Sequence, residues 1–285
     1  MEEAIKKSKV LIEALPYIKK FFGRVVVIKY GGSSLGKKQV RDRVLQDIVF
    51  MRYAGMKPVL VHGGGPNITE KLKEAGMESK FVGGLRITSK KAIKVIDSVL
   101  TEVNRELVAV IKRFGAEAFG LSGKENNMIQ ATRHEKGDEL GYVGNVSAID
   151  TTVLERLINT NVIPVVSPVS KGSDDEVYNI NADEAASRLA IALDAEKFVL
   201  LTNVRGVMRD KNDPESLYHS LTLEEANVLI EKGVIEGGML PKTKACLHAL
   251  EGGVRKSHIV EADLPHALLL EMFTDKGIGT EIVKG

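Results

Sequence analysis

The chain has 285 residues, of which 44% are hydrophobic and 27% charged. This length allows one large globular domain or two closely packed lobes. The 40 basic and 38 acidic residues give a formal net charge of +2 and form no basic block, so we expect no nucleic-acid partner. No apolar run approaches the roughly 18 residues of a membrane span, and the N-terminus lacks the apolar region of a signal peptide. We therefore expect a cytoplasmic protein without a membrane partner.

Residues 2–22 form an amphipathic helical pattern, with acidic residues at its start and lysines near its end, which suits the helix dipole. Pro16 lies inside this pattern and is expected to kink or divide the helix. The helix either packs on its own domain or forms an arm that meets another subunit, and the pattern favours neither. Its apolar stripe consists of Leu11, Leu15, Ile18 and Phe22.

After this helix, apolar β-branched runs alternate with helical patterns, which is typical of parallel βαβ units in one continuous α/β sheet. Residues 116–147 differ, because glycines divide them into short segments that favour hairpins over crossover units. The single cysteine, Cys246, is expected to fill a core position on a helix. The predicted strands are 24–30, 58–62, 162–166, 197–202 and 257–260, and the later helices are 151–159, 182–193, 222–232, 241–251 and 265–273.

The first candidate site follows the strand that ends at Lys29 and Tyr30. Two glycines come next, and they let the backbone approach a phosphate closely while the lysine adds a positive charge. The segment from Gly31 to Lys37 matches the P-loop spacing, but Lys38 stands where a magnesium-binding serine or threonine is required. A damaged P-loop, a turn without a ligand and a different phosphate site remain open at this point.

Three further segments carry polar or glycine-rich signals at strand ends and helix starts. His62 precedes three glycines, a surplus that suggests amides facing a ligand, and His62 itself is interpreted as an orienting or packing residue. Residues 178–183 place Asn and Asp at a helix start, where capping and ligand binding are both reasonable. Lys242 lies in the first turn of a helix after Gly237 and Gly238, against the helix dipole, which favours an anionic ligand there.

Together, these segments resemble the amino-acid kinase superfamily and, within it, the acetylglutamate kinases. The resemblance covers about residues 10–283. It implies a three-layer αβα sandwich with a central, mostly parallel sheet. Three segments depart from the family pattern: residues 31–35 read GGSSL where relatives commonly read GGSAM, Asn203 stands in place of an aspartate, and residues 261–263 replace an Asp-Gly-Arg turn. The matching segments, in order, are VIKYGGSS, VHGGGPNI, GLRIT, GYVGNV, YNINADEAA, VIEGGMLPK and PHALLLEMFTDKGIGT.

The resemblance implies that ATP phosphorylates the γ-carboxylate of N-acetyl-L-glutamate, the second step of arginine synthesis. Lys29 and Lys242 then match the lysines that stabilise the phosphoryl group, and Asp183 matches the carboxylate that orients them. Mg²⁺ accompanies ATP without direct protein ligands. The implied phosphate and ATP contacts are Gly31, Gly32, Thr202 and Lys242, and the implied acceptor contacts are Gly64, Gly65, Arg86 and Asn179.

The resemblance also implies regulation and assembly. Residues 1–22 would be an oligomerisation helix, residues 23–180 an acyl-acceptor lobe and residues 181–285 an ATP-binding lobe. Relatives with such a helix are arginine-inhibited hexamers, built as trimers of dimers, and a nitrogen-regulatory signalling protein is a further expected partner. The implied arginine contacts are His266, Glu271, Gly277, Gly279 and Glu281.

Two alternatives remain open. An acetylaminoadipate kinase of lysine synthesis would act on an acceptor one methylene longer, which is worth only about 1–3 kcal/mol of discrimination. A non-catalytic arginine sensor would keep the fold without turnover. Retention of Lys29, Asp183 and Lys242 argues against the sensor, because sensing requires none of the three.

Overall fold

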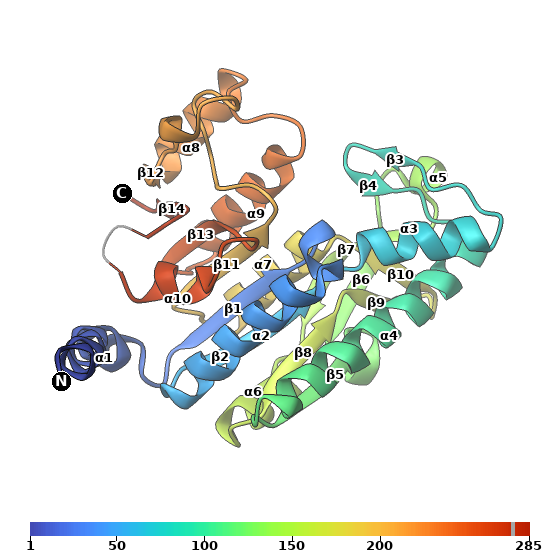
Figure 1. The fold of residues 1–285 in the computed structure, drawn as a ribbon. Coiled ribbons are helices and arrows are strands. Elements are labelled where there is room, and N and C mark those ends of the chain that lie inside the picture. The colour runs from blue at the N-terminus through green and yellow to red at the C-terminus, as the bar shows by residue number, and fades with distance from the viewer. Residues whose placement is uncertain (275–276) are drawn as a thin grey trace.

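A central eight-stranded sheet with helices on both faces organises the molecule (Figure 1). The computed structural model describes residues 1–274 and 277–285, apart from the side chains of residues 2–4, 6–8, 10, 11 and 214. All neighbouring strands of the sheet are parallel except β13 and β14, which confirms the mostly parallel α/β sheet. In spatial order the strands are β12 (Ser220–Thr222), β14 (Thr280–Val283), β13 (Lys256–Glu261), β11 (Lys197–Thr202), β1 (Val25–Tyr30), β2 (Lys57–His62), β8 (Ile163–Ser167) and β5 (Ala118–Ser122).

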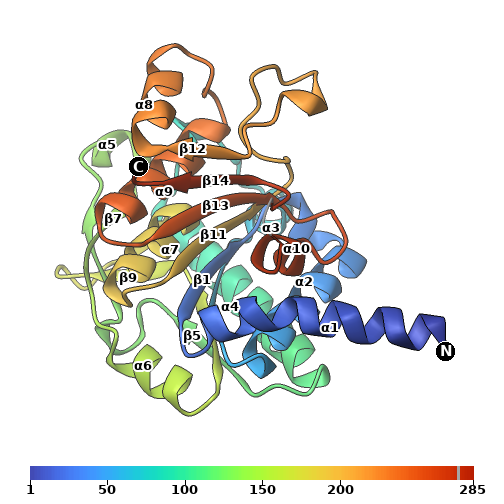
Figure 2. The same cartoon turned by 90° about the vertical axis from the view of Figure 1, so that its left-hand side faces the viewer.

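The sheet separates two hydrophobic cores, which confirms the three-layer architecture (Figure 2). Because side chains alternate along a strand, Val26 and Ile28 of β1 enter one core while Val27 enters the other. The first core is covered by α2 (Lys38–Tyr53), α3 (Gly65–Glu74), α4 (Lys90–Arg113) and α10 (Ala267–Met272). The second is covered by α6 (Thr152–Asn159), α7 (Ala182–Ala192), α8 (Leu223–Glu231) and α9 (Met239–Glu251).

The middle of the chain departs from the prediction in one place. Residues 118–122 form β5, a parallel strand of the main sheet rather than part of a hairpin. This strand lies at the sheet edge and Phe119 on it is exposed, so its sequence lacks the continuous apolar run of a central strand. Hairpin-like pairing is correct farther on: β6 (Ile129–Arg133) pairs antiparallel with β7 (Val143–Ile149), and both join β9 (Val169–Gly172) and β10 (Val177–Ile180) in a small closed barrel.

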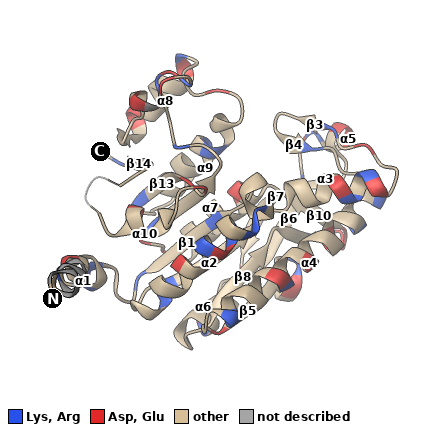
Figure 3. Cartoon of the chain, viewed as in Figure 1, with Lys and Arg blue, Asp and Glu red and all other residues tan. Residues whose placement is uncertain are grey.

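Short elements surround this framework. A two-stranded hairpin, β3 (Phe81–Val82) and β4 (Leu85–Arg86), lies beside α3 and α5 (Gly137–Leu140) (Figure 1). Three short 3₁₀ helices span Ser33–Gly36, Glu125–Asn127 and Pro214–Ser216. Acidic and basic residues are interspersed along the described helices (Figure 3).

The first helix, α1 (Glu2–Phe21), extends along the margin of the molecule (Figure 2). It runs through Pro16 as one helix, so the expected division is wrong. Of its predicted stripe, Leu15 and Phe22 are 41% and 69% exposed, Ile18 is half-buried, and the Leu11 side chain lies outside those described. Among the described helices, none is both long enough and apolar enough to cross a membrane.

Candidate active site

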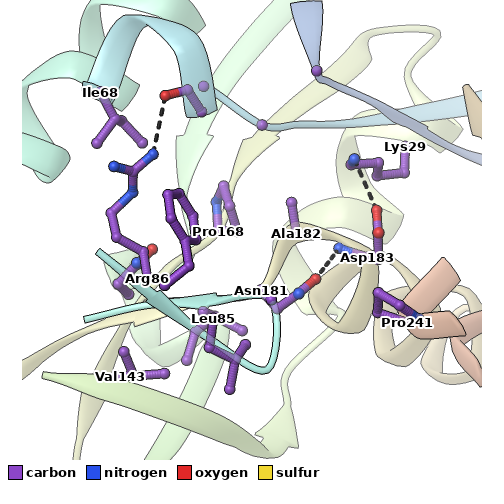
Figure 4. A pocket seen from close by; sticks show the side chains of 18 of the residues that line it. Lys29, Ile68, Leu85, Arg86, Val143, Pro168, Asn181, Ala182, Asp183 and Pro241 are labelled. Carbon is purple, nitrogen blue, oxygen red and sulfur yellow. Dashed lines mark hydrogen bonds and ion pairs between the residues drawn. The ribbon is translucent and has the colours of Figure 1, made fainter. Parts of the chain in front are cut away.

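A cavity of 340 Å³ opens at the carboxyl ends of β1 and β2, where ligands bind in open α/β sheets. We call it the central cavity (Figure 4). Its wall combines the glycine turns after both strands, the β3–β4 hairpin, the end of β10 and the N-terminal turns of α7 and α9. The cavity therefore draws together segments that are far apart in the sequence.

Two lysines share one buried carboxylate in this cavity. Lys29 Nζ lies 2.8 Å from Asp183 Oδ1, and Lys242 Nζ lies 3.0 Å from Asp183 Oδ2. Burial alone would raise the pKa of Asp183, but the two ammonium groups lower it to about 2. The carboxylate is therefore ionised at neutral pH, and this trio, which we call the lysine clamp, retains an excess positive charge toward the cavity.

The N-terminal turn of α7 holds Asp183 in place. Asn181 caps the helix: its Oδ1 accepts hydrogen bonds from the backbone N–H groups of Asp183 at 2.8 Å and Glu184 at 3.3 Å. The expected capping is confirmed, yet Asn181 was not among the predicted site residues although it also lines the cavity. Cys246 is fully buried and burial raises the pKa of its thiol, which agrees with the predicted core position.

Two glycines of these turns lie close to neighbouring side chains, one of them in the clamp. A Cβ on Gly31 would lie 3.0 Å from Lys29 Nζ, and one on Gly64 would lie 2.8 Å from Leu100 Cδ2. Gly32 has a φ of +79°, which favours glycine. The N–H of Gly63 donates to the carbonyl of Tyr30 at 2.8 Å and joins the two turns. Gly32, Gly64 and Gly65 line the cavity, and Gly31 adjoins it through Lys29.

Arg86 lies on the opposite wall of the central cavity. Its guanidinium donates to the Gly65 carbonyl and to Thr69 Oγ1, both at 3.0 Å, and to Ser79 Oγ. It also lies 4.6 Å from the centre of the Phe81 ring. These contacts fix the guanidinium plane before any ligand binds.

The acceptor side of the cavity has polar and apolar components. Asn179 Nδ2 donates to Thr88 Oγ1 at 3.3 Å, and Asn179 lines the same cavity as Arg86. Leu85 and Val143, which sequence reasoning did not single out, supply an apolar wall beside them. The site can hold an anion at one end and a small apolar group nearby.

A second cavity of 480 Å³ adjoins the first; both are lined by Gly238 and Lys242. We call it the neighbouring cavity. Thr202 lies here rather than in the central cavity, and Thr202 Oγ1 donates to Asn203 Oδ1 at 3.3 Å. Its apolar lining includes Val207, Ile235 and Met239. Lys242 thus lies where a group could pass from one cavity to the other.

A third cavity of 580 Å³ lies at the far end of β11 and β13, beside the end of α1, and we call it the distal cavity. Of the predicted arginine contacts, Glu271, Gly277 and Glu281 line it together with Lys197 and Lys256.

Glu271 is fixed by several donors. Its carboxylate contacts His258 Nδ1 at 2.6 Å and accepts from the backbone N–H groups of Ile278 and Gly279 at 2.8 and 3.1 Å. Against the effect of burial, these contacts lower the pKa of Glu271 to about 2. Burial lowers the pKa of Lys197 to about 8. Gly279 does not itself line the distal cavity; its N–H donates to the carboxylate of Glu271, which does.

His266 points elsewhere. It precedes α10 in the left-handed conformation, and its Nδ1 lies 2.6 Å from Asp47 Oδ1 on α2. Residues 275 and 276 of the same predicted segment lie outside the described residues.

Potential metal ligands are few among the described residues that line the central and neighbouring cavities. Among the described residues, no group of three or more His, Cys, Asp or Glu side chains could hold a metal ion. The residues of the two joined cavities therefore do not fit a metal held by the protein. Their cationic side chains are Lys29, Arg86, Lys211 and Lys242.

Comparison with known proteins agrees with this geometry. The profile described as "Amino acid kinase family" matches residues 24–261. The acetylglutamate kinase of Heliobacterium modesticaldum is 47% identical over 295 residues and covers all of both chains. That of Pelotomaculum thermopropionicum is 48% identical over 290 residues, or 98% of each chain. The chain belongs to the acetylglutamate kinase family of amino acid kinases.

The fold also matches that of a larger solved protein. N-acetylglutamate synthase from Neisseria gonorrhoeae, complexed with coenzyme A and N-acetyl-glutamate, has a TM-score of 0.85 and 25% sequence identity. The match covers 98% of this chain and 63% of that one, so the present chain spans under two thirds of the synthase. The sandwich described above is therefore the amino-acid kinase fold, as acetylglutamate kinase family membership requires.

Proposed function

We propose that the protein transfers the γ-phosphoryl group of ATP to the γ-carboxylate of N-acetyl-L-glutamate, giving N-acetyl-L-glutamyl 5-phosphate in cytoplasmic arginine biosynthesis. The carrying observation is the lysine clamp, which lies in the central cavity and includes Lys242 at its boundary with the neighbouring cavity. The full-length identity to acetylglutamate kinases supports the acceptor. In this proposal residues 23–180 supply the acceptor lobe and residues 181–285 the ATP-binding lobe.

The proposed reaction needs little covalent help from the protein. The acceptor carboxylate is already ionised, so its oxygen attacks the γ-phosphorus without a general base, and the bond from phosphorus to the leaving ADP oxygen breaks. Lys29 and Lys242 would neutralise charge on the phosphoryl oxygens, while Asp183 holds both ammonium groups at 2.8 and 3.0 Å. Amides of Gly32 and Gly64 would add hydrogen bonds. Mg²⁺ would arrive with ATP, coordinated by phosphate oxygens.

Acceptor selection would rest on the opposite wall. The fixed guanidinium of Arg86 suits the α-carboxylate, Asn179 offers polar contact, and Leu85 and Val143 suit the acetyl methyl group. The 340 Å³ cavity does not by itself distinguish acceptors that differ by one methylene.

A single assay tests the function and its alternatives. Acyl phosphate is trapped with hydroxylamine while acetylglutamate, acetylaminoadipate and aspartate are offered in turn with ATP and Mg²⁺. We expect turnover with acetylglutamate. Turnover only with acetylaminoadipate would reassign the acceptor, and no turnover with any of them, together with arginine binding, would make the protein a sensor.

We extend the proposal to feedback inhibition by L-arginine in the distal cavity. Glu271 and Glu281 could bind the cationic groups of arginine, and Lys197 or Lys256 its carboxylate. The end of α1 contributes Tyr17, Lys20 and Phe21 to the same cavity, so α1 would connect arginine binding with assembly.

Assembly would use exposed apolar side chains of α1 together with Phe22, which directly follows it. Ile12, Leu15 and Phe22 are 68%, 41% and 69% exposed, and a second copy of this helix is the proposed partner, in a hexamer built as a trimer of dimers. Deletion of residues 1–22 should then give dimers on light scattering, and unchanged hexamers would refute the arm. A nitrogen-regulatory signalling protein remains a proposed partner.

A further inference from the structure

We propose that His62 and Asn104 are positioning residues: together they orient the peptide group between Gly63 and Gly64 so that the Gly64 N–H faces the transferred phosphoryl group. The inference rests on the proposed function and adds two residues to it. Neither side chain is part of the lysine clamp, and His62, at the end of β2, is fully buried.

The hydrogen-bond chain determines which nitrogen of His62 carries the proton. Asn104 Nδ2 donates to the carbonyl of Val165 at 2.8 Å and lies 3.1 Å from His62 Nε2. The Asn104 amide cannot be reversed, because its oxygen would then face the Val165 carbonyl, and two acceptors repel. The amide nitrogen is therefore the donor to both groups, and His62 Nε2 must be an unprotonated acceptor.

The other imidazole nitrogen then acts on the glycine turn. With Nε2 as acceptor, Nδ1 carries the proton and donates to the Gly63 carbonyl, 2.9 Å away. This carbonyl and the Gly64 N–H belong to one planar trans peptide group, so they point in opposite directions. Because His62 holds the carbonyl on the buried side, the N–H is directed away from the core, where Gly64 lines the central cavity.

The turn is held from a second side as well. The N–H of Gly63 donates to the Tyr30 carbonyl, so both peptide groups that flank Gly63 are fixed. Burial lowers the pKa of His62 to about 4, so the imidazole stays neutral and keeps its acceptor at Nε2 at neutral pH. A buried neutral imidazole that holds a backbone carbonyl orients the site and does not act as its general base.

A matched pair of variants tests this role. His62→Asn and His62→Leu both branch at Cγ and both remove the acceptor for Asn104, but only asparagine can donate to the Gly63 carbonyl from near the Nδ1 position. We expect His62→Leu to lower kcat about tenfold to hundredfold with KM for ATP little changed, and His62→Asn to stay within about threefold of the native kcat, since a misdirected donor weakens only the transition state. Equal losses of kcat in the two variants at similar thermal stability would overturn the proposal.

A spectroscopic measurement tests the geometry without relying on activity. In ¹⁵N-labelled protein, the His62 resonances, assigned by their absence in His62→Asn, should show protonated Nδ1 and unprotonated Nε2 from pH 6 to 8. Asn104→Leu, which removes the donor to Nε2, should weaken this preference without abolishing it, because the Gly63 carbonyl still accepts from Nδ1. A proton on Nε2 in the native protein, or titration of His62 in this range, would overturn the inference. Failure of the native protein to form acyl phosphate would instead refute the proposed function while these spectra still report on His62.

Discussion

Two buried carboxylates, Asp183 in the central cavity and Glu271 in the distal cavity, reach the same acidity by different means. The pKa of each is about 2, although burial alone would raise both. Asp183 is held ionised by two lysine ammonium groups. Glu271 is held by His258 and by two backbone N–H groups.

The difference matches the ligands that we propose for the two cavities. The partners of Asp183 are flexible side chains carrying full charges, and they can share those charges with a phosphoryl group. The backbone partners of Glu271 are fixed, and Lys197, Lys256 and Glu281 add both signs of charge around it. An excess of positive charge suits phosphate, whereas mixed charge suits an amino acid that is itself zwitterionic.

Loss of a clamp lysine should produce the largest effect. Lys242→Ala should lower kcat by roughly 10²–10³, the scale of losing one preorganised donor in a catalytic site. Steady-state kinetics with hydroxylamine trapping measures it, and Lys244→Ala, an exposed lysine on the same helix, is the matched control. A near-normal kcat in Lys242→Ala would show that this lysine takes no part in the reaction. The proposed difference in ligand between the central and distal cavities would then lose its support.

Substitution of Arg86, on the acceptor side of the central cavity, should have the next largest effect. Arg86→Lys should raise KM for acetylglutamate roughly tenfold to hundredfold, because lysine cannot reproduce a bidentate, charge-assisted contact. KM for ATP should change little, since Arg86 lines only the central cavity of the joined pair. The control is Arg255→Lys, whose side chain is 65% exposed. Equal increases in both KM values would contradict the assignment of Arg86 to the acceptor.

The distal cavity should respond independently of the clamp. Glu281 contacts Lys256 at 2.8 Å and faces the cavity. Glu281→Gln removes one negative charge and should raise the arginine concentration for half-inhibition about tenfold, the scale of one hydrogen bond to a charged group. Without arginine, kcat should stay within about twofold, since distant sites act additively. Glu231→Gln, an exposed glutamate on α8, is the control; unchanged inhibition in Glu281→Gln would separate this cavity from arginine.

The parts of the clamp could be singled out locally because they occupy regular positions: Lys29 lies at the end of a buried strand, and Asp183 and Lys242 lie in the first turns of helices. Their grouping into one catalytic set came from the resemblance to the acetylglutamate kinases. The glycine turns were also identifiable from their regular positions. The α/β rhythm likewise gave the parallel core of the sheet.

Other features depended on distant contacts that no local pattern encodes. The edge strand β5 was missed because it is half-exposed and contains Gly120. His266 was assigned to the arginine site by its place in a matching segment, but its partner Asp47 is 219 positions away in sequence. The apolar wall of the central cavity likewise combines Leu85 of the β3–β4 hairpin with Val143 of the small barrel. A single apolar residue in the sequence does not indicate that it will contact a distant segment.

Substitution of the two carboxylates, Asp183 and Glu271, should have the smallest effect. It should appear in the free energy of unfolding at acidic pH. A carboxyl whose pKa is lowered on folding contributes stability above its unfolded pKa, and that stability is lost as pH falls toward the folded pKa. For Asp183 and Glu271, whose ordinary pKa values are 3.8 and 4.5, the loss should occur between about pH 5 and 2. Urea unfolding measures this loss. In Asp183→Asn and in Glu271→Gln, the free energy of unfolding should fall less between these pH values than in the native protein, by on the order of 1–2 kcal/mol for each variant.

Because the sites are separate, the double variant should show the sum of the two changes. A double variant that loses no more than either single one would mean that the two carboxylates titrate as one coupled system, and the two cavities would then not be independent.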